Sequence, residues 1–358
     1  MNKIGVNILL SHVKDYNRLL SRLRTLKPSA VVATVDGKND IPRVTALRAA
    51  LPDTLVIGRV YYEQDGAMHT KPQATGDNNY WVVSPENALN EWGELGRNGG
   101  VLYLANEPGT NPENILRLMD WTCQVIELAH QRGIRLCVMN LSVGTPRIED
   151  GWGVYKRDTG EVTLDPVLRL LAQYREMMLG LHEYLPGDKR VGRLDYLYSR
   201  CRALNIQVPN ICITEFGYDA LDGADPKNGY KSRDISGQEY AKTLLGVYQA
   251  VYAPHPEIIG ATVFCAGDNG SWRAFDTEQD SGFWDELIRD SQLLEPPKTP
   301  TPTKPLPIPP VETFPAEPPT APGLELVYPF PPGTTKELAE AIARMFSKAY
   351  VREVKKAS

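Results

Sequence analysis

Eight short apolar runs, rich in β-branched residues, recur along the first part of the chain. Between them lie longer stretches in which apolar residues return every three or four positions. The runs are typical of strands, and the longer stretches are typical of helices that bury one face. Inside the runs apolar residues follow one another, which indicates strands covered on both sides, as in a parallel sheet. The predicted strands are 3–10, 30–35, 54–62, 101–106, 135–142, 178–184, 210–215 and 258–266, and the predicted helices lie near 15–26, 42–51, 85–95, 112–131, 166–176, 192–204, 237–252 and 282–293.

Helix boundaries are marked in several places. Three helices are predicted to begin at a capping residue followed by proline, at Ser84-Pro85, Asn111-Pro112 and Asp165-Pro166. Gly133 is a suitable end for the helix predicted at 112–131. Eight strands, each followed by a helix, predict a (β/α)8 barrel of the TIM type. A doubly wound open sheet is the alternative fold, but the first strand–helix turn lacks the glycine-rich phosphate loop of that fold.

The composition changes abruptly after residue 295. Residues 296–322 contain twelve prolines, which predicts an extended spacer without a core of its own. A capping box begins at Thr334, and apolar residues then recur at helical spacing from Leu338 to Tyr350. We therefore expect a barrel in residues 1–295, a Pro-rich linker in 296–333 and an amphipathic C-terminal helix in 334–358. One such helix cannot bury its apolar face alone, so it is expected to dock on the barrel, bind a protein partner or begin a truncated module.

Charge and composition narrow the classes of partner. The net charge is −5, which argues against a nucleic-acid partner, and no apolar run reaches the ~20 residues that cross a bilayer. The N-terminus is interpreted as the first strand rather than a signal peptide, which leaves a cytoplasmic location or export by a non-classical route. The five cysteines are widely spaced and lie inside predicted elements, which indicates buried free thiols. The five histidines lack ligand spacing, so neither a metal nor an organic cofactor is expected.

Two of the predicted strands lead directly into a glutamate. The run at 101–106 is followed by Glu107, and the run at 210–215 ends in Glu215. Residues at the carboxyl ends of barrel strands form the active site in this architecture, so both side chains are expected to face one mouth. Two carboxyl groups roughly 5–5.5 Å apart are required for cleavage of a glycosidic bond with retention of configuration. The structural alternative is that both glutamates are helix-initiating acids favoured by the helix dipole.

The residues around these glutamates resemble a known signature. Asn106-Glu107-Pro108 and Thr214-Glu215-Phe216-Gly217 are similar to the catalytic segments of clan A, the retaining (β/α)8 glycoside hydrolases. His182-Glu183-Tyr184, at the end of the sixth strand, is similar to the His-x-Tyr of cellulase- and mannanase-like members. The resemblance covers residues 3–293. It implies Glu107 as acid/base, Glu215 as nucleophile, and His182 and Tyr184 in contact with these carboxylates.

The resemblance also suggests substrate-binding residues. It implies that Asn106 donates a hydrogen bond to the sugar 2-hydroxyl and that Trp272, in the loop after the eighth strand, forms an aromatic floor under the sugar. Trp152 and Trp81 are candidate platforms for further sugars, with loop packing as the alternative, and Asn140 is a candidate for lining the cleft.

The sequence departs from the cellulase-like pattern in two strands. The second strand offers Asp36 where an arginine is usual, and the third brings Arg59 and Tyr61 in place of the commoner histidine. These departures leave the exact family and the sugar open.

The expected function is therefore a retaining glycosidase that cleaves β-glycosidic bonds of an oligo- or polysaccharide with two glutamates. One alternative is a carbohydrate-binding barrel without catalysis. A lyase or aldolase with a Schiff-base lysine is disfavoured, because no lysine lies at the carboxyl end of a predicted strand. A phage-type cell-wall-degrading enzyme is a further alternative, in which the substrate changes to peptidoglycan and the two-glutamate chemistry stays.

Overall fold

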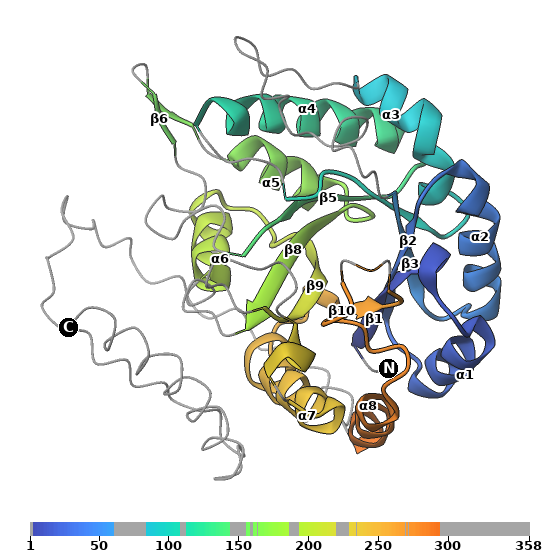
Figure 1. Cartoon of the computed structure of the whole chain (residues 1–358). Coiled ribbons are helices and arrows are strands. Elements are labelled where there is room, and N and C mark those ends of the chain that lie inside the picture. Colours follow the sequence, from blue (N-terminus) through green and yellow to red (C-terminus); the bar gives the residue numbers. More distant parts are fainter. Residues whose placement is uncertain are drawn as a thin grey trace, which may run out of the picture.

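The computed structural model is a closed barrel of eight parallel strands (Figure 1). It describes residues 3–60, 84–107, 112–143, 155–157, 160–162, 164–185, 193–219, 229–233, 235–268, 270 and 272–293. The strand order is β1-β10-β9-β8-β5-β4-β3-β2, with β1 pairing β10 to close the ring. The strands are β1 Ile4–Leu9, β2 Ala30–Val35, β3 Leu55–Val60, β4 Val101–Tyr103, β5 Leu136–Leu141, β8 Met178–Leu185, β9 Asn210–Tyr218 and β10 Ile258–Ala266.

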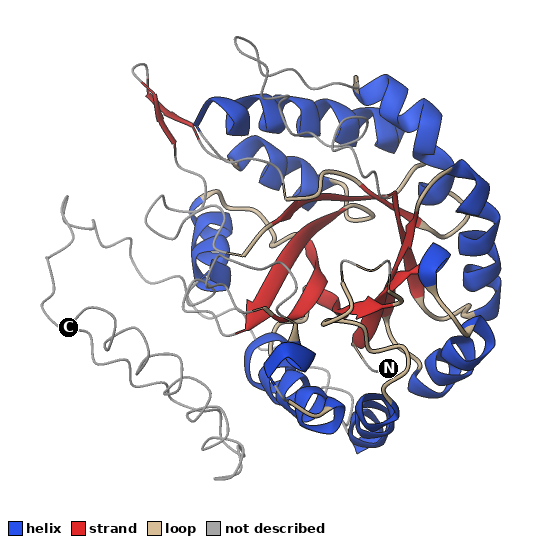
Figure 2. Cartoon of the chain, in the orientation of Figure 1, coloured by secondary structure: helices blue, strands red, loops and turns tan. Residues whose placement is uncertain are grey.

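Helices surround this barrel on the outside, as Figure 2 shows in blue around the red strands. They are α1 Tyr16–Leu26, α2 Ile41–Ala50, α3 Pro85–Trp92, α4 Pro112–Gln131, α5 Asp165–Gln173, α6 Arg193–Ala203, α7 Gly237–Val247 and α8 Ser281–Leu293. A π-helical turn, Tyr248–Tyr252, continues α7, and a small antiparallel hairpin of β6 Tyr155–Arg157 and β7 Gly160–Val162 lies between β5 and α5. The predicted (β/α)8 barrel is thus confirmed, with each predicted strand and helix present. The predicted linker at 296–333 and helix at 334–358 lie outside the described residues.

The helix ends largely follow the sequence signals. Ser84 caps α3 by accepting a hydrogen bond from the Asn87 N–H at 3.2 Å, and Gly133 ends α4 with a φ of +63°. The cap predicted at Asp165 is wrong: α5 begins at that residue, and Leu164 holds the capping position without a side-chain hydrogen bond. Both carboxylate oxygens of Asp165 instead accept hydrogen bonds from Arg200, at 2.7 and 2.6 Å. Asp165 therefore forms an ion pair with the next helix, α6, instead of capping α5.

The barrel interior is filled in layers. A lower apolar cluster, separate from the larger core between strands and helices, consists of Ala30, Val32, Ile57, Val101, Tyr103, Cys137, Met178 and Cys212. All five cysteines of the chain are free, as predicted, and four of them are buried. Within the described residues, no helix is long and apolar enough to cross a membrane.

A layer of buried polar side chains lies inside the barrel as well. Thr34 donates to Asn7 Oδ1 at 3.0 Å, Thr214 donates to Asn140 Oδ1 at 3.0 Å, and Thr262 donates to the Thr214 carbonyl at 2.6 Å. These five residues, which we call the polar layer, are all at least 97% buried. Hydrogen bonds compensate the cost of burying such groups, so the layer ties β1, β2, β5, β9 and β10 together at a defined height in the barrel.

Candidate active site

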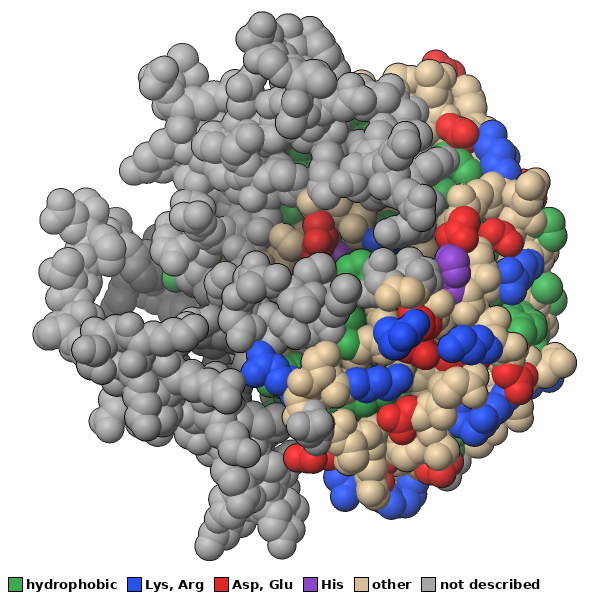
Figure 3. All heavy atoms as spheres, in the orientation of Figure 1, with side chains coloured by type: hydrophobic (Ala, Val, Ile, Leu, Met, Phe, Trp, Pro, Cys, Tyr) green, Lys and Arg blue, Asp and Glu red, His purple; other side chains and the backbone are tan. Residues whose placement is uncertain are grey.

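A cavity opens at the carboxyl ends of the strands. Figure 3 shows acidic, basic and histidine side chains together in a hollow near the centre of this face. One part of the cavity wall is polar, and its residues are Thr34, Arg59, Asn106, Glu107, Glu215 and Asp219. The rest is apolar or aromatic, with Leu9, Tyr184, Phe264, Trp272 and Phe275. A mostly apolar wall with a few convergent polar groups is typical of a small-molecule site.

The backbone at the end of β4 aims Glu107 into this cavity. Ala105 and Glu107 have φ of +63° and +45°, in the left-handed region that non-glycine residues rarely adopt. The N–H of Glu107 donates to the Asn140 carbonyl at 3.1 Å, which holds the turn against the end of β5. Backbone in this conformation concentrates at functional sites, and here it turns an acid that follows a buried strand toward the barrel axis.

Glu215 reaches the same place from β9. A register shift in the β8–β9 pairing, between Leu181 and His182, brings His182 opposite Glu215. Directly paired residues of neighbouring strands project to the same side of the sheet, so both side chains enter the barrel mouth. One carboxylate oxygen of Glu107, one of Glu215 and a ring nitrogen of His182 all lie within 4.8 Å of one another.

His182 bridges the two acids. Its Nδ1 lies 2.9 Å from Glu107 Oε1 and 3.4 Å from Glu215 Oε2. The ring is fully buried, whereas the Glu107 side chain is 41% exposed and the Glu215 side chain only 8%. The two carboxyls thus share a histidine but differ in their access to solvent.

Two donors hold the carboxylate of Glu215. Arg59 donates to its Oε1 at 2.5 Å, and the Tyr184 hydroxyl donates to its Oε2 at 2.6 Å. Burial, with the neighbouring charge of Glu215, raises the pKa of Tyr184 well above its ordinary value, so the phenol stays a donor at neutral pH. Burial acts to lower the pKa of Arg59, but the adjacent Tyr103 and Glu215 outweigh it and the pKa is raised. Both contacts stabilise negative charge on Glu215.

Tyr103, on β4, contacts three polar side chains of the site. Its hydroxyl donates to Asn106 Oδ1 at 2.7 Å and lies 2.9 Å from His182 Nε2. The guanidinium of Arg59 lies over its ring, 5.1 Å from the centroid. The ring is buried inside the barrel, and these contacts connect the neighbours of Glu107 with those of Glu215.

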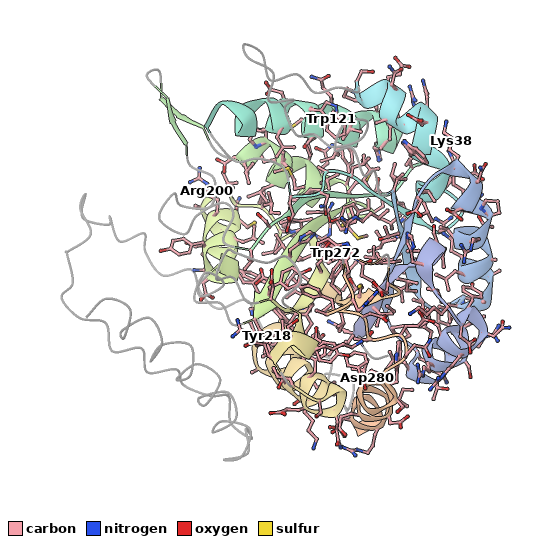
Figure 4. The ribbon with its side chains drawn as sticks, in the orientation of Figure 1. Lys38, Trp121, Arg200, Tyr218, Trp272 and Asp280 are labelled. Carbon is pink, nitrogen blue, oxygen red and sulfur yellow. The ribbon has the colours of Figure 1, made fainter. Side chains whose placement is uncertain are left out.

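Aromatic rings form the opposite wall. Trp272 stands edge to face with Phe264 and Phe275, with centroids 5.2 and 5.8 Å apart, and Tyr184 packs edge to face with both phenylalanines. In Figure 4 the Trp272 label lies over the centre of the barrel, whereas Lys38 and Arg200 lie at its periphery. The half-buried indole therefore lines the cavity where sequence analysis expected a sugar floor.

Six of the predicted site residues meet in this cavity or directly beside it. Glu107, Glu215, Asn106, Tyr184 and Trp272 line the cavity, and His182 joins the two glutamates from below. Trp152 and Trp81 lie outside the described residues, so their predicted roles stay predictions.

Asn140 does not line the cavity, which corrects the sequence-based expectation. The side chain is completely buried in the polar layer. Its amide nitrogen donates to the carbonyls of Leu104 and Cys137 at 2.8 and 3.2 Å, and its oxygen accepts from Thr214. A left-handed backbone at Met139 and Asn140, with φ of +72° and +32°, turns the amide inward. The residue types at these two positions do not predict this backbone conformation.

Sequence analysis missed several residues in or beside the cavity, Tyr103 and Asp219 among them, and noted Arg59 only as a departure. Tyr103 carries a hydroxyl at an inward position of an apolar strand, and Asp219 follows Glu215 by four residues; both features were visible but common. Arg59 was recorded as an unusual residue of the third strand, and the structure shows that it binds the carboxylate of Glu215.

A metal ion is the alternative occupant of the Glu107, His182 and Glu215 cluster, because each offers one ligand atom within reach. The surroundings disfavour it. Arg59 places a cation on Oε1 of Glu215, and Tyr184 donates to Oε2. Both would compete with a second cation for the same lone pairs. With these contacts, the two carboxyl groups are better suited to reacting directly with a substrate than to binding a metal ion.

Similarity between this chain and known proteins is low. No family model matches the chain, and no curated protein matches it in sequence. Among solved structures, the chain is similar to a glycoside hydrolase family 30 subfamily 8 xylanase from Clostridium acetobutylicum, at 11% identity and a TM-score of 0.47 over 82% of this chain and 71% of that one.

Two further solved structures are similar to this chain at the same low level. A family 30 endoxylanase from Clostridium papyrosolvens aligns over 83% of this chain and 73% of its own, at 13% identity and a TM-score of 0.46. A GH128 endo-β-1,3-glucanase from Amycolatopsis mediterranei aligns over 80% and 99%, at 12% identity and a TM-score of 0.39. Likeness at this level says nothing about the reaction or the substrate of this chain.

Proposed function

We propose that this protein is a retaining glycoside hydrolase that cleaves β-glycosidic bonds of an oligo- or polysaccharide by double displacement. The observation that carries the proposal is the distance between the acids: one carboxylate oxygen of Glu107 and one of Glu215 lie within 4.8 Å. Retaining enzymes hold their carboxyl groups roughly 5–5.5 Å apart, and inverting enzymes hold them roughly 6.5–9.5 Å apart to admit a water molecule. The short separation favours a nucleophile over a water-activating base.

The surroundings of the two acids support different roles. Glu215 receives hydrogen bonds from Arg59 and Tyr184 on its two oxygens, which favours the ionised form that a nucleophile needs. Glu107 is the more exposed of the two and lies beside His182, a position suited to exchanging protons with a leaving group and with water. We therefore assign Glu215 as nucleophile and Glu107 as acid/base.

The reaction then proceeds in two balanced steps. Glu215 attacks the anomeric carbon while Glu107 gives its proton to the departing glycosidic oxygen, which leaves as an alcohol. This breaks one carbon–oxygen bond and forms the ester of a glycosyl-enzyme. In the second step Glu107, now a carboxylate, takes a proton from water, and the resulting oxygen nucleophile displaces Glu215. Both acids return to their starting states, and the sugar keeps its configuration.

Neighbouring residues supply contacts for the sugar. Asn106 lines the cavity next to Glu107 and carries an amide suited to a ring hydroxyl. Trp272 and the phenylalanines beside it give an aromatic wall, and such rings pack against the apolar C–H face of a pyranose. The β specificity is what the clan resemblance implies, and the identity of the sugar is left to experiment.

The first test measures reducing-sugar release from plant, fungal and bacterial polysaccharides, peptidoglycan included, and from aryl β-glycosides. Glu215→Gln should lose all turnover, because an amide cannot attack the anomeric carbon. Glu257→Gln is the matched control: this half-buried glutamate also accepts a tyrosine hydroxyl, from Tyr198 at 3.0 Å, but it lies before β10, at the other end of the barrel. Its activity should stay at the wild-type level.

The anomer formed first, followed by proton NMR during hydrolysis of an aryl β-glycoside, tests retention. A β-anomer is expected, and an α-anomer would contradict the nucleophile. Activity surviving in Glu215→Gln would show that the acids are misassigned. A wild type that binds the sugars without turnover would favour the carbohydrate-binding alternative. A chelator should leave the rate unchanged, and loss of activity with it would favour a metal in the cluster.

A further inference from the structure

We propose that Tyr103 is a positioning residue whose single hydroxyl sets the orientation of the Asn106 amide and the tautomer of His182 together. The proposal rests on the proposed function for its chemical meaning, but the arrangement itself can be tested without turnover. Tyr103 touches neither a carboxylate oxygen of the acid pair nor, by position, a sugar. It acts through the two residues to which its oxygen is bonded.

The surroundings of the Tyr103 hydroxyl restrict the hydrogen bonds that it can form. Tyr103 lies on β4 inside the barrel and is 2% exposed. Burial raises the pKa of its phenol well above the ordinary value, although Arg59 acts to lower it, so the group keeps its proton at neutral pH. A phenol has one proton to donate and lone pairs to accept with. The two neighbours of the oxygen, at 2.7 and 2.9 Å, must therefore play different parts.

Counting protons assigns those parts. The atom of Asn106 that faces Tyr103 is the amide oxygen, which can only accept, so the phenol proton points at it. The phenol oxygen must then accept from His182, which requires a proton on Nε2. The structure thus links one amide orientation with one histidine tautomer. Turning the amide over would reverse both bonds, because its nitrogen would donate to the phenol and the phenol to Nε2.

The first consequence concerns Asn106. With its oxygen held by Tyr103, the remaining polar atom of the side chain is the amide nitrogen, a donor. Asn106 lines the cavity beside Glu107, so the group offered to a substrate hydroxyl is a donor. Without the Tyr103 hydroxyl the amide would present nitrogen and oxygen with similar ease.

The second consequence concerns the acid. When the proton of a neutral His182 sits on Nε2, Nδ1 carries a lone pair, and Nδ1 lies 2.9 Å from Glu107 Oε1. A hydrogen bond at that contact needs a proton, which the protonated form of Glu107 supplies. The network therefore favours the protonated acid that the first step requires. Among the described residues, the charged and titratable groups that face Glu107 from the neighbouring strands include Arg59, Tyr103, His182, Tyr184 and Glu215.

Tyr103→Phe tests the proposal, because it removes the hydroxyl and keeps the ring under Arg59. The probes are the p-nitrophenyl β-glycoside that the wild type hydrolyses fastest and its 2-deoxy analogue. We expect kcat/KM for the parent glycoside to fall roughly 10- to 100-fold, the range for a hydrogen bond to a charged or developing-charge centre. The 2-deoxy analogue, which lacks the hydroxyl that Asn106 would hold, should lose far less. The alkaline limb of the kcat/KM profile should move to lower pH.

Tyr230→Phe is the matched control. Tyr230 is also a buried tyrosine, in the 3-10 turn before α7, and its hydroxyl donates to Asp280, just before α8, at 2.9 Å. The variant should lose stability to a similar degree and keep the wild-type ratio of parent to 2-deoxy rates. Equal slowing of both probes by Tyr103→Phe, with an alkaline limb that does not move, would mean that the tyrosine only supports the fold, and would overturn the assignment.

A second measurement does not depend on activity. Nitrogen-15 NMR of labelled imidazoles distinguishes the two histidine tautomers, and His182→Gln identifies the signal of His182 among the five histidines. We expect neutral His182 to carry its proton on Nε2 in the wild type and to populate the Nδ1 form in Tyr103→Phe. A wild-type His182 protonated on Nδ1, or a tautomer that the mutation leaves unchanged, would refute the proposal. A protein without glycosidase activity but with the expected tautomers would refute the proposed function alone.

Discussion

At the scale of single residues, the site places one functional group in two different surroundings. Glu215 is nearly enclosed and bound on both oxygens by a guanidinium and a phenol. Glu107 stands on an irregular turn at the mouth, more open to solvent and next to a histidine. Burial, charge and hydrogen bonding set the surroundings of a carboxyl group, so the different roles that we propose for the two glutamates rest on their different neighbours.

Changing Glu107 to alanine tests the acid role directly. Substrates with a poor leaving group need the proton, so their hydrolysis should slow by about 10²–10⁴-fold, the usual contribution of general acid catalysis. Aryl glycosides with an activated leaving group should form the glycosyl-enzyme at close to the normal rate and then stall. The measurement is kcat/KM across aryl β-glycosides of graded leaving-group acidity.

Added azide provides the internal control for that variant. A small anion can enter the space of the missing side chain and attack the glycosyl-enzyme without a base, which should restore turnover and yield the β-glycosyl azide. Equal slowing of good and poor leaving groups, with no azide rescue, would remove Glu107 from the acid/base position.

The two glutamates proposed as the catalytic pair could be predicted from sequence because they follow strands whose ends must share one mouth. Asn140 was misplaced because its side-chain direction depends on two left-handed residues at the end of β5. Tyr103 was missed because a tyrosine in an apolar strand is an ordinary core residue. Its role depends on which side chains of β3 and β8 arrive beside it, and a linear pattern does not contain that information.

At the scale of elements, strands and helices were predictable because each carries its own periodicity. What escaped prediction lies where neighbouring elements compete for the same group. Asp165 pairs with Arg200 of α6 instead of capping α5. The register shifts of β5 and β8 likewise depend on the strands that pair with them. These shifts set which side chains face the barrel mouth.

Gly180 of β8 is such a point of contact between elements. A Cβ at this position would lie 1.9 Å from Asn140 Oδ1 and 3.0 Å from Cys137 Sγ. Asn140 cannot move aside cheaply, because three hydrogen bonds hold its amide. Gly180→Ala should therefore lower the free energy of unfolding by about 1–3 kcal/mol, the usual cost of overpacking. Urea unfolding gives the value.

Two companion variants make that result specific. Gly37→Ala, at a position where a Cβ would meet nothing within 4 Å, should leave the unfolding free energy nearly unchanged. In an Asn140→Ala background the cost of Gly180→Ala should largely vanish, because the clash partner is gone and neighbouring changes are not additive. A full cost in that background would place the strain elsewhere.

At the scale of the whole molecule, the barrel is complete within residues 3–293. β1 pairs with β10, and α8 packs against α1 and α7. A chain ending at residue 295, without the proline-rich segment, should unfold within roughly 2 °C of the full chain, less than the shift that 1 kcal/mol causes in a domain of this size. It should also hydrolyse small aryl glycosides at the same rate. Calorimetry and kinetics on both chains check this, and a large loss of stability would show that the tail docks on the barrel.

Closure of the ring through β1 and β10 also sets an order of events during biosynthesis. The partner that covers one edge of the first strand is the last strand to be made, since Ile4 pairs with Ala261. At about 5–20 residues per second, the ribosome delivers that partner on the order of 10–50 s after the first strand. For that time the nascent chain carries an open sheet edge, a feature that favours wrong pairing and aggregation. The barrel mouth that holds Glu107 and Glu215 therefore closes only after β10 has been made.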